Sequence, residues 1–265
     1  MSWIKYQAGA QWMLFTCAFL LVAVWETIDQ RRPLGRPPEK RWANHGVLLI
    51  LSTVLGLAVF RVTAVAFAGM AVSSGFGILN KPWLPFILKL ACAIIALDFI
   101  RYLAHRAFHS VPFLWRIHEV HHSDPDYDAS TAARFHPLEA VIDQAVLLAG
   151  IALLAPPPAA VFSSELLATA LNVFVHANAS LPDRAERLLR RLVITPDLHR
   201  VHHSEEITEQ SSNFGQTFCC WDRLFGTYRQ RQEIGDRTVV TGIKGLQNAG
   251  SMEIQFMLSE PFRRS

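Results

Sequence analysis

Clustered histidines are the residues of this chain whose spacing most clearly predicts chemistry. The pattern H-x-x-H-H occurs twice, and a pair of histidines four residues apart precedes both copies. These residues are His105, His109, His118, His121, His122, His199, His202 and His203. With 11 histidines in 265 residues, chance supplies only roughly 0.02 copies of the pattern per chain, by plain counting. The duplication therefore requires a reason.

Helical spacing lets each cluster present its imidazoles together. Residues three and four apart on a helix share a face, with Cβ atoms about 5–6 Å apart. His176, at the end of an apolar segment, is a ninth candidate, whereas the isolated His45 is interpreted as a hydrogen-bonding surface residue. One ion cannot use nine ligands, but two ions with about four to six ligands each can. Imidazole binds iron, zinc, copper and nickel, so the sequence predicts a two-metal site without choosing the metal.

A competing motif overlaps the first cluster. His118-Glu119-Val120-His121-His122 also satisfies H-E-x-x-H, the pattern of zinc hydrolases in which the glutamate is the general base. The second copy has Arg200 at the position of Glu119. A hydrolase also has no use for the other clustered histidines, so the two-metal interpretation is preferred.

The composition predicts an all-α integral membrane protein. Hydrophobic residues make up 51% of the chain, charged residues only 18%, and the mean hydropathy is +0.22, whereas soluble domains carry about 25% charged residues. The apolar residues form blocks at 12–28, 46–60, 82–104, 140–155 and 158–177. Several blocks approach the roughly 20 residues that span a bilayer as a helix. We expect about four to five transmembrane helices and no removable signal peptide.

Basic residues in the first loop predict the side of the membrane on which the histidines lie. Five arginines and lysines fall within residues 31–41, and the positive-inside rule places such a loop in the cytoplasm. Counting crossings from this loop puts 105–138 and 183–265, with all the histidine clusters, on the cytoplasmic side. The stretch 61–81 is either re-entrant or an extension of the second helix, and a single extra crossing there would reverse this result.

Cysteine usage and charge limit the compartment and the partners. The four cysteines, Cys17, Cys92, Cys219 and Cys220, do not form the pattern of a disulfide framework, which favours a reducing compartment. The net charge is +3, and basic residues lie beside membrane segments. This favours contact with anionic lipid head groups over nucleic acid. An amphipathic helix that lies along the membrane surface is expected from about residue 182.

Asp98 and Arg101 lie inside the third apolar block and share a helix face with His105. Charges in such a block cost a few kcal/mol each unless they are paired or face a polar cavity. Two interpretations are open. Asp98 either pairs with Arg101, or it orients the His105 imidazole by accepting its second N–H.

Taken with the membrane segments between them, the histidine clusters resemble those of the membrane fatty acid hydroxylase and sterol desaturase superfamily. Further similar stretches are Asp98-Phe-Ile-Arg-Tyr102, Arg134-Phe-His-Pro-Leu-Glu139, Val175-His-Ala-Asn178, Asn213-Phe-Gly215 and Trp221-Asp-Arg-Leu-Phe-Gly-Thr-Tyr228. The resemblance divides the chain into N-terminal membrane helices with a basic loop (1–97), a histidine-box catalytic region (98–228) and a C-terminal cytosolic tail (229–265).

The resemblance implies membrane helices capped by a cytosolic, helical, histidine-rich unit. It also implies two irons, which zinc can replace in purified protein, with O2 as co-substrate. The eight clustered histidines and His176 would be ligands, and His136 and Asn178 match family positions as candidate ligands or partners of ligands. Some members carry a second histidine where Ser180 stands here, and Asn178 could fill that gap. No fused haem domain is expected in the 36 residues after Arg229, so a separate protein would donate electrons.

The function expected from this resemblance is hydroxylation of an unactivated C–H bond in a membrane lipid. A desaturase would use the same residues with a different placement of the substrate. From other classes, the alternatives are a membrane zinc hydrolase that uses Glu119 and a non-enzymatic metal-binding or transport protein. The expected location is a bacterial inner membrane.

Overall fold

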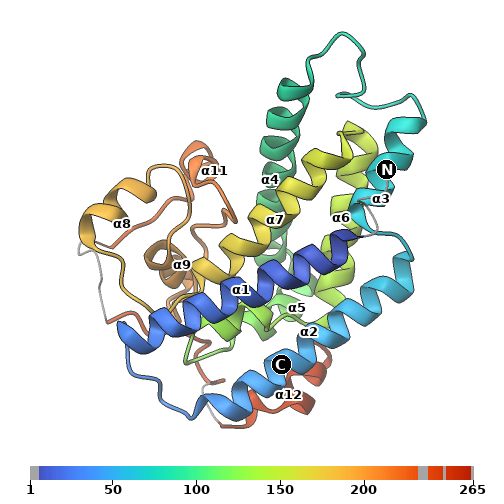
Figure 1. The fold of residues 1–265 in the computed structure, drawn as a ribbon. Helices are drawn as coiled ribbons and strands as arrows, with labels where there is room; N and C mark the ends of the chain where they lie inside the picture. The colour runs from blue at the N-terminus through green and yellow to red at the C-terminus, as the bar shows by residue number, and fades with distance from the viewer. Residues whose placement is uncertain (1–5, 232–237, 247–248, 264–265) are drawn as a thin grey trace.

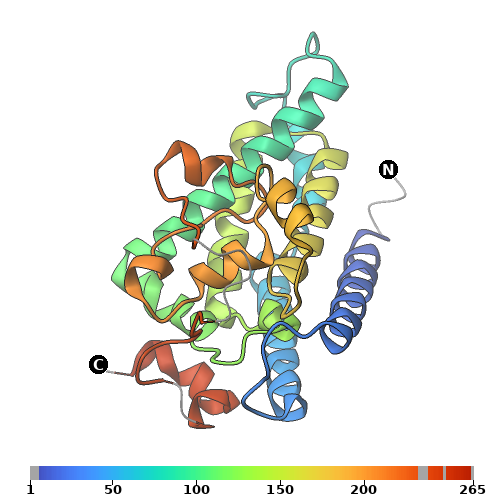
Figure 2. The same cartoon turned by 90° about the vertical axis from the view of Figure 1, so that its left-hand side faces the viewer.

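The computed structural model describes residues 6–231, 238–246 and 249–263. Within these residues the chain forms helices and three isolated β-bridges but no strand, which confirms the all-α prediction. The long helices are α1 (Gln7–Ile28), α2 (Pro38–Phe60), α4 (Phe86–Ser110), α6 (Pro137–Leu154) and α7 (Pro158–Val175). Figure 1 shows them as a bundle, and in Figure 2 α1 stands at its edge.

Four segments are long and apolar enough to cross a membrane. They are α1, α2 continued by α3 (Ala64–Ser73), α6 and α7. This agrees with the expected four to five. The longest helix, α4, was expected to cross over 82–104, but it is not among these four segments, and Lys89, Asp98 and Arg101 interrupt its apolar run.

The ambiguous stretch 61–81 extends the second helix and turns at the far end of the bundle. Arg61 ends α2 in the left-handed region (φ 53°), and Thr63 caps α3 by accepting a hydrogen bond from the Ala66 N–H. Beyond α3, the N–H groups of residues 78 and 79 bond the carbonyls at the end of α6. This close approach of the backbones requires glycine at position 77. Gly77 has a φ of 111°, and a Cβ atom there would lie 2.2 Å from the Cβ atom of Ala155.

Packing of α4, α6 and α7 provides the centre of the bundle. Leu97 of α4, Ile151 of α6 and Val161 of α7 are fully buried in one apolar cluster. Around this centre α1 packs on α7 and α2 packs on α6. The outer helices leave apolar side chains such as Leu21 and Ile50 exposed, as expected of surfaces that face lipid.

Proline determines where the helices that carry the site begin. It occupies the first turn of α2, α6, α7, α5 (Pro112–His122) and α9 (Pro196–His202). Proline fits there because its φ is already helical and its missing N–H would have no helical partner. Thr195 adds a side-chain cap to α9. In both short helices, α5 and α9, histidines occupy the last turn.

The polar segments form a second unit at one end of the bundle, with α9 beside α7 and α12 (Ile254–Ser259) beside α2 (Figure 1). Besides α5 and α9 it contains only short elements. These are η2 (Ala129–Ala133), α8 (Asp183–Leu189), α10 (Ile207–Gln210), α11 (Cys220–Leu224), η3 (Ala249–Met252), α12 and η4 (Glu260–Phe262). The tail gave no structural signal in the sequence, yet its Met257 is buried against Leu48 and Val120.

Arg134 joins the tail to this unit. Its fully buried guanidinium donates to the carbonyls of Val120 (2.8 Å) and Ser251 (2.9 Å) and to the Ser123 hydroxyl (2.8 Å). It also bonds His45 Nε2 at 3.0 Å. His45 is thus a hydrogen-bonding residue, as expected, but the prediction that it lies on the surface is wrong, because it is 1% exposed.

Candidate metal centre

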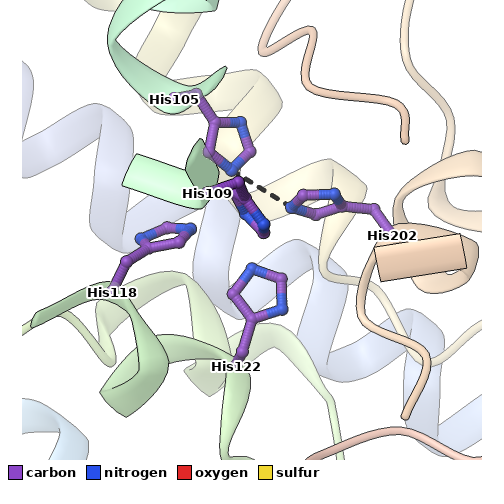
Figure 3. A group of neighbouring side chains, drawn as sticks. All are labelled: His105, His109, His118, His122 and His202. Carbon is purple, nitrogen blue, oxygen red and sulfur yellow. Dashed lines mark hydrogen bonds between the residues drawn. The ribbon is translucent and has the colours of Figure 1, made fainter. Parts of the chain in front are cut away.

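Nine of the ten predicted metal-ligating histidines meet in two adjoining groups. In each group the nearest ligand atoms all lie within 4.8 Å of one another. Group one contains His105, His109, His118, His122 and His202, which Figure 3 shows converging from separate helices. Group two contains His121, His176, His199 and His203.

Each H-x-x-H-H motif contributes to both groups. On α5, the pair His118 and His122, four residues apart, points into group one, while the residue between them, His121, enters group two. The second copy is reversed, because its i,i+4 pair enters group two and His202 enters group one. Residues at i and i+4 share a helix face, and i+3 lies about 100° around the axis from i+4. The duplicated motif therefore supplies two adjacent sites from two short helices.

Backbone carbonyls determine the orientation of several imidazoles. His105 Nδ1 lies 2.8 Å from the Phe214 carbonyl, and His202 Nδ1 lies 2.7 Å from the Ser212 carbonyl. A carbonyl oxygen only accepts hydrogen bonds, so both Nδ1 atoms carry the proton. In the neutral rings both Nε2 atoms then carry an unshared electron pair. These Nε2 atoms face each other at 3.1 Å. Two lone pairs at that distance repel each other, and a cation between them removes the repulsion.

Group two shows the same arrangement. His176 Nδ1 donates to the Asn172 carbonyl at 2.7 Å, and its Nε2 lies 3.1 Å from His199 Nε2 and 3.3 Å from His121 Nε2. Further ring nitrogens in both groups are buried without a hydrogen-bond partner, including both nitrogens of His122 and of His203. Buried polar atoms are rarely left unpaired. The donor sets therefore fit two metal ions.

Burial keeps these imidazoles in the form that binds metals. It lowers the pKa of His118 to about 3 and the pKa of His176 to about 4. The pKa values of His121, His122 and His203 are lowered well below their usual range, by burial first and by neighbouring imidazoles second. Neutral imidazole is the ligand form, so no proton competes with a metal near pH 7.

Glu139 is a functional residue that the sequence interpretation missed. Its Oε1 accepts a hydrogen bond of 2.7 Å from His118 Nδ1, and the residue is only 2% exposed. A carboxylate that holds the outer N–H of a ligand imidazole determines its tautomer and orientation. The available signal was a glutamate in the first turn of a mainly apolar helix.

Glu119 does not lie at the histidine groups. Its surroundings are Arg116 and Glu260 of the tail, and burial followed by the Glu260 charge raises the pKa of its carboxyl. A general base must be within hydrogen-bond reach of the proton that it removes. The arrangement therefore argues against the zinc hydrolase.

We expect Glu119→Gln to leave metal content and lipid oxidation within about threefold of the unmodified protein, because the side chain touches neither histidine group. Turnover of purified protein and metal analysis would measure this. Glu260→Gln controls for the local change of charge. A loss of activity above about a hundredfold with the metal retained would restore Glu119 as a base.

The hydrogen bonds of Asp98 differ from those that either interpretation expected. Its Oδ2 accepts hydrogen bonds from Trp221 Nε1 (2.8 Å) and from the Phe218 N–H (3.3 Å), while His105 is oriented by a backbone carbonyl. Arg101 pairs with Glu165 of α7 instead of with Asp98. Asp98 thus attaches α4 to the segment that leads into α11.

His136 and Asn178 lie outside both histidine groups among the residues described. His136 caps α6, and its Nε2 bonds the Leu258 carbonyl at 3.3 Å. The Asn178 amide donates to the Arg32 carbonyl at 2.7 Å, and its backbone N–H bonds Glu26. The structure therefore gives both residues structural contacts and does not support them as ligands.

A cavity of about 560 Å³ leads from the bundle to the histidines. It is lined by residues of α1, α2, α4, α6 and α7 and reaches His105 and His118 of group one. It also reaches His121, His176 and His199 of group two. An apolar molecule held between the membrane helices could therefore reach both groups.

Apolar helices, two groups of buried histidines that could each hold a metal ion, and a connecting cavity define the class of this protein as a membrane protein with clustered histidines. The family model for fatty acid hydroxylase matches residues 90–227, and the chain belongs to this family. The resemblance stated from the histidine clusters is thus confirmed. Its characterised relatives are oxidoreductases.

The chain is 27% identical over 180 residues to an ornithine lipid hydroxylase of Rhizobium tropici, covering 68% of this chain and 52% of the relative. It is 30% identical over 203 residues to an alkylglycerol monooxygenase of Xenopus tropicalis, covering 72% and 44%. A very-long-chain aldehyde decarbonylase of rice is 26% identical over 193 residues, covering 72% and 71%. The chain thus spans about half the length of the first two relatives. No solved structure matches it.

Proposed function

We propose that this protein is a di-iron monooxygenase that uses O2 to hydroxylate an unactivated C–H bond of a membrane lipid. The observation that carries the proposal is the pair of buried, neutral histidine groups at the end of a cavity between apolar helices. Two relatives are named for the ornithine lipids and alkylglycerols on which they act, and this supports a substrate lipid with a polar head group.

In this proposal the nine grouped histidines hold two irons, and iron supplies the redox chemistry with O2 that zinc cannot. His105, His176 and His202 are oriented by backbone carbonyls and His118 by Glu139. The membrane helices admit the lipid and exclude bulk water. The overall change combines the C–H bond with O2, two electrons and two protons to give a hydroxyl group and water.

The proposal also includes a location and a partner. We place the histidine groups on the cytoplasmic side, together with the basic loop at 31–41 that the positive-inside rule locates there; this assignment requires α4 to cross the membrane, as the count of crossings assumed. A separate electron-donor protein supplies the two electrons. The membrane would be a bacterial inner membrane.

The proposal predicts about two irons per chain in protein purified in mild detergent from iron-supplied cells. Incubation with membrane lipids, a reductant and isotopically labelled O2 should add one labelled oxygen atom to a lipid, as detected by mass spectrometry. Zinc-loaded protein is the control, because zinc has no redox chemistry.

Other outcomes distinguish the alternatives. Loss of two hydrogens from the lipid without labelled oxygen would indicate a desaturase with the same metal centre. One tightly bound zinc with lipid cleavage would indicate a hydrolase. Iron-loaded protein that oxidises no lipid of the source membrane would contradict the proposal.

A further inference from the structure

The cavity that reaches the histidines has one strongly polar wall. Glu165, Thr169 and Asn172 of α7 all line it at helical spacing, and with His176 they form a polar stripe roughly 16 Å long at 1.5 Å per residue. Asp143 and Gln144 of α6 face the same space. A tunnel for hydrocarbon alone would not need these side chains, since unpaired polar groups are costly inside a membrane.

Two carboxyl groups on this wall have acceptor atoms without a donor. Asp143 lines the cavity and interacts electrostatically with Arg101, but no hydrogen bond or ion pair joins its side chain to another residue that the structure describes. Glu139, one turn earlier on α6, is 2% exposed, and its Oε2 has no partner while Oε1 holds His118. The cavity wall therefore offers hydrogen-bond acceptors next to a ligand histidine.

The nearby arginine is already engaged. Arg101 Nη1 donates to the Ser164 hydroxyl at 2.8 Å, and its Nη2 pairs with the Glu165 carboxylate. This ion pair joins α4 to α7 across the cavity. It leaves the Asp143 and Glu139 acceptors to be satisfied by whatever occupies the cavity.

The part of the wall formed by α1 and α2 combines apolar side chains with Gln11, Ser52 and Thr53. The apolar side chains include Trp12 and Phe15 of α1 and Leu49 and Leu57 of α2. These helices are bridged at one end by the Thr63–Gln7 hydrogen bond and at the other by the Phe19–Trp42 ring contact (5.1 Å). Hydrocarbon can therefore lie between α1 and α2 while a polar group lies against α6.

We propose that the cavity binds a lipid through a hydrogen-bond-donating head group, a hydroxyl or a protonated amine, which Asp143 accepts. This proposal rests on the proposed function for the assignment of the lipid as substrate. Asp143 and Glu139 are four residues apart, about 6 Å along the helix. The head group would therefore lie about 6 Å, measured along α6, from the carboxyl group that holds His118.

Binding of defined probes to the metal-loaded protein tests this assignment without turnover. The probes are hexadecylglycerol, which has free hydroxyls, its O-methylated counterpart, which has none, and hexadecylamine, each with a brominated tail. Trp12 lines the cavity, so bromine quenching of tryptophan fluorescence reports occupancy. We expect the donor-bearing probes to bind at least about tenfold more tightly than the methylated one.

Asp143→Leu should reduce this preference to within about twofold, and Asp143→Asn, which keeps one acceptor at the same size, should give an intermediate value. The matched control is Asp29→Asn, which changes an exposed carboxylate outside the cavity and should keep the full preference. Metal content is measured in every variant.

Equal binding of the methylated probe to the unmodified protein, or an unchanged preference in Asp143→Leu, would overturn the assignment. Protein that keeps the preference but oxidises no lipid would refute only the proposed function. Tighter binding of the amine or of the hydroxyl probe would each support the site and identify the head group.

Discussion

Replacing His202 or His203 by alanine is expected to remove metal from different sites, although the two residues are adjacent in sequence. His202 belongs to group one and His203 to group two. Each variant should therefore lose about half of the bound metal. The rate of lipid oxidation should fall by more than about a hundredfold in each variant. Mutation of a residue that only hydrogen-bonds to a metal ligand already lowers metal affinity or activity about 10–100-fold.

Metal analysis with spectroscopy of the remaining ion measures this outcome. His136→Asn is the matched control, because His136 lies outside both groups and asparagine preserves a side-chain cap for α6. It should keep both metals. Full metal content in His202→Ala, or loss of metal in His136→Asn, would contradict the division of the histidines into these groups.

Replacing Arg134 by methionine should destabilise the protein by about 3–5 kcal/mol, the usual cost of breaking a buried charged network. Methionine retains much of the apolar stem but leaves the carbonyls of Val120 and Ser251 and the Ser123 hydroxyl without their donor. Because Val120 lies between ligands on α5, metal affinity should fall as well.

Thermal unfolding in detergent, followed with and without added metal, measures this effect. Arg187→Met is the control, since Arg187 is exposed on α8 and makes only a weak pair with Asp183 at 3.7 Å. Its unfolding temperature should stay close to that of the unmodified protein. An equally small shift in Arg134→Met would show that the tail does not stabilise the histidine unit.

Missed contacts explain the errors about Asp98, His136 and Asn178. Asp98 shares a helix face with His105, and His136 and Asn178 match family positions, which suggested roles at the metal. Their actual partners are distant in the chain, as with Asp98 and Trp221, 123 residues apart. Sequence position cannot show which of several acceptors a side chain meets, because loop geometry decides that choice.

The sequence by itself determined the helical class, the apolar segments and the nine histidines that meet, since these depend on local spacing along a helix and on composition. Only the tertiary structure decided how the histidines divide between two groups. It also showed that Glu139 holds His118 and that Asp143 faces the cavity. These features depend on the packing of α4, α5, α6, α7 and α9 against one another. Helical periodicity specifies the face on which a side chain lies, whereas long-range packing specifies what that face meets.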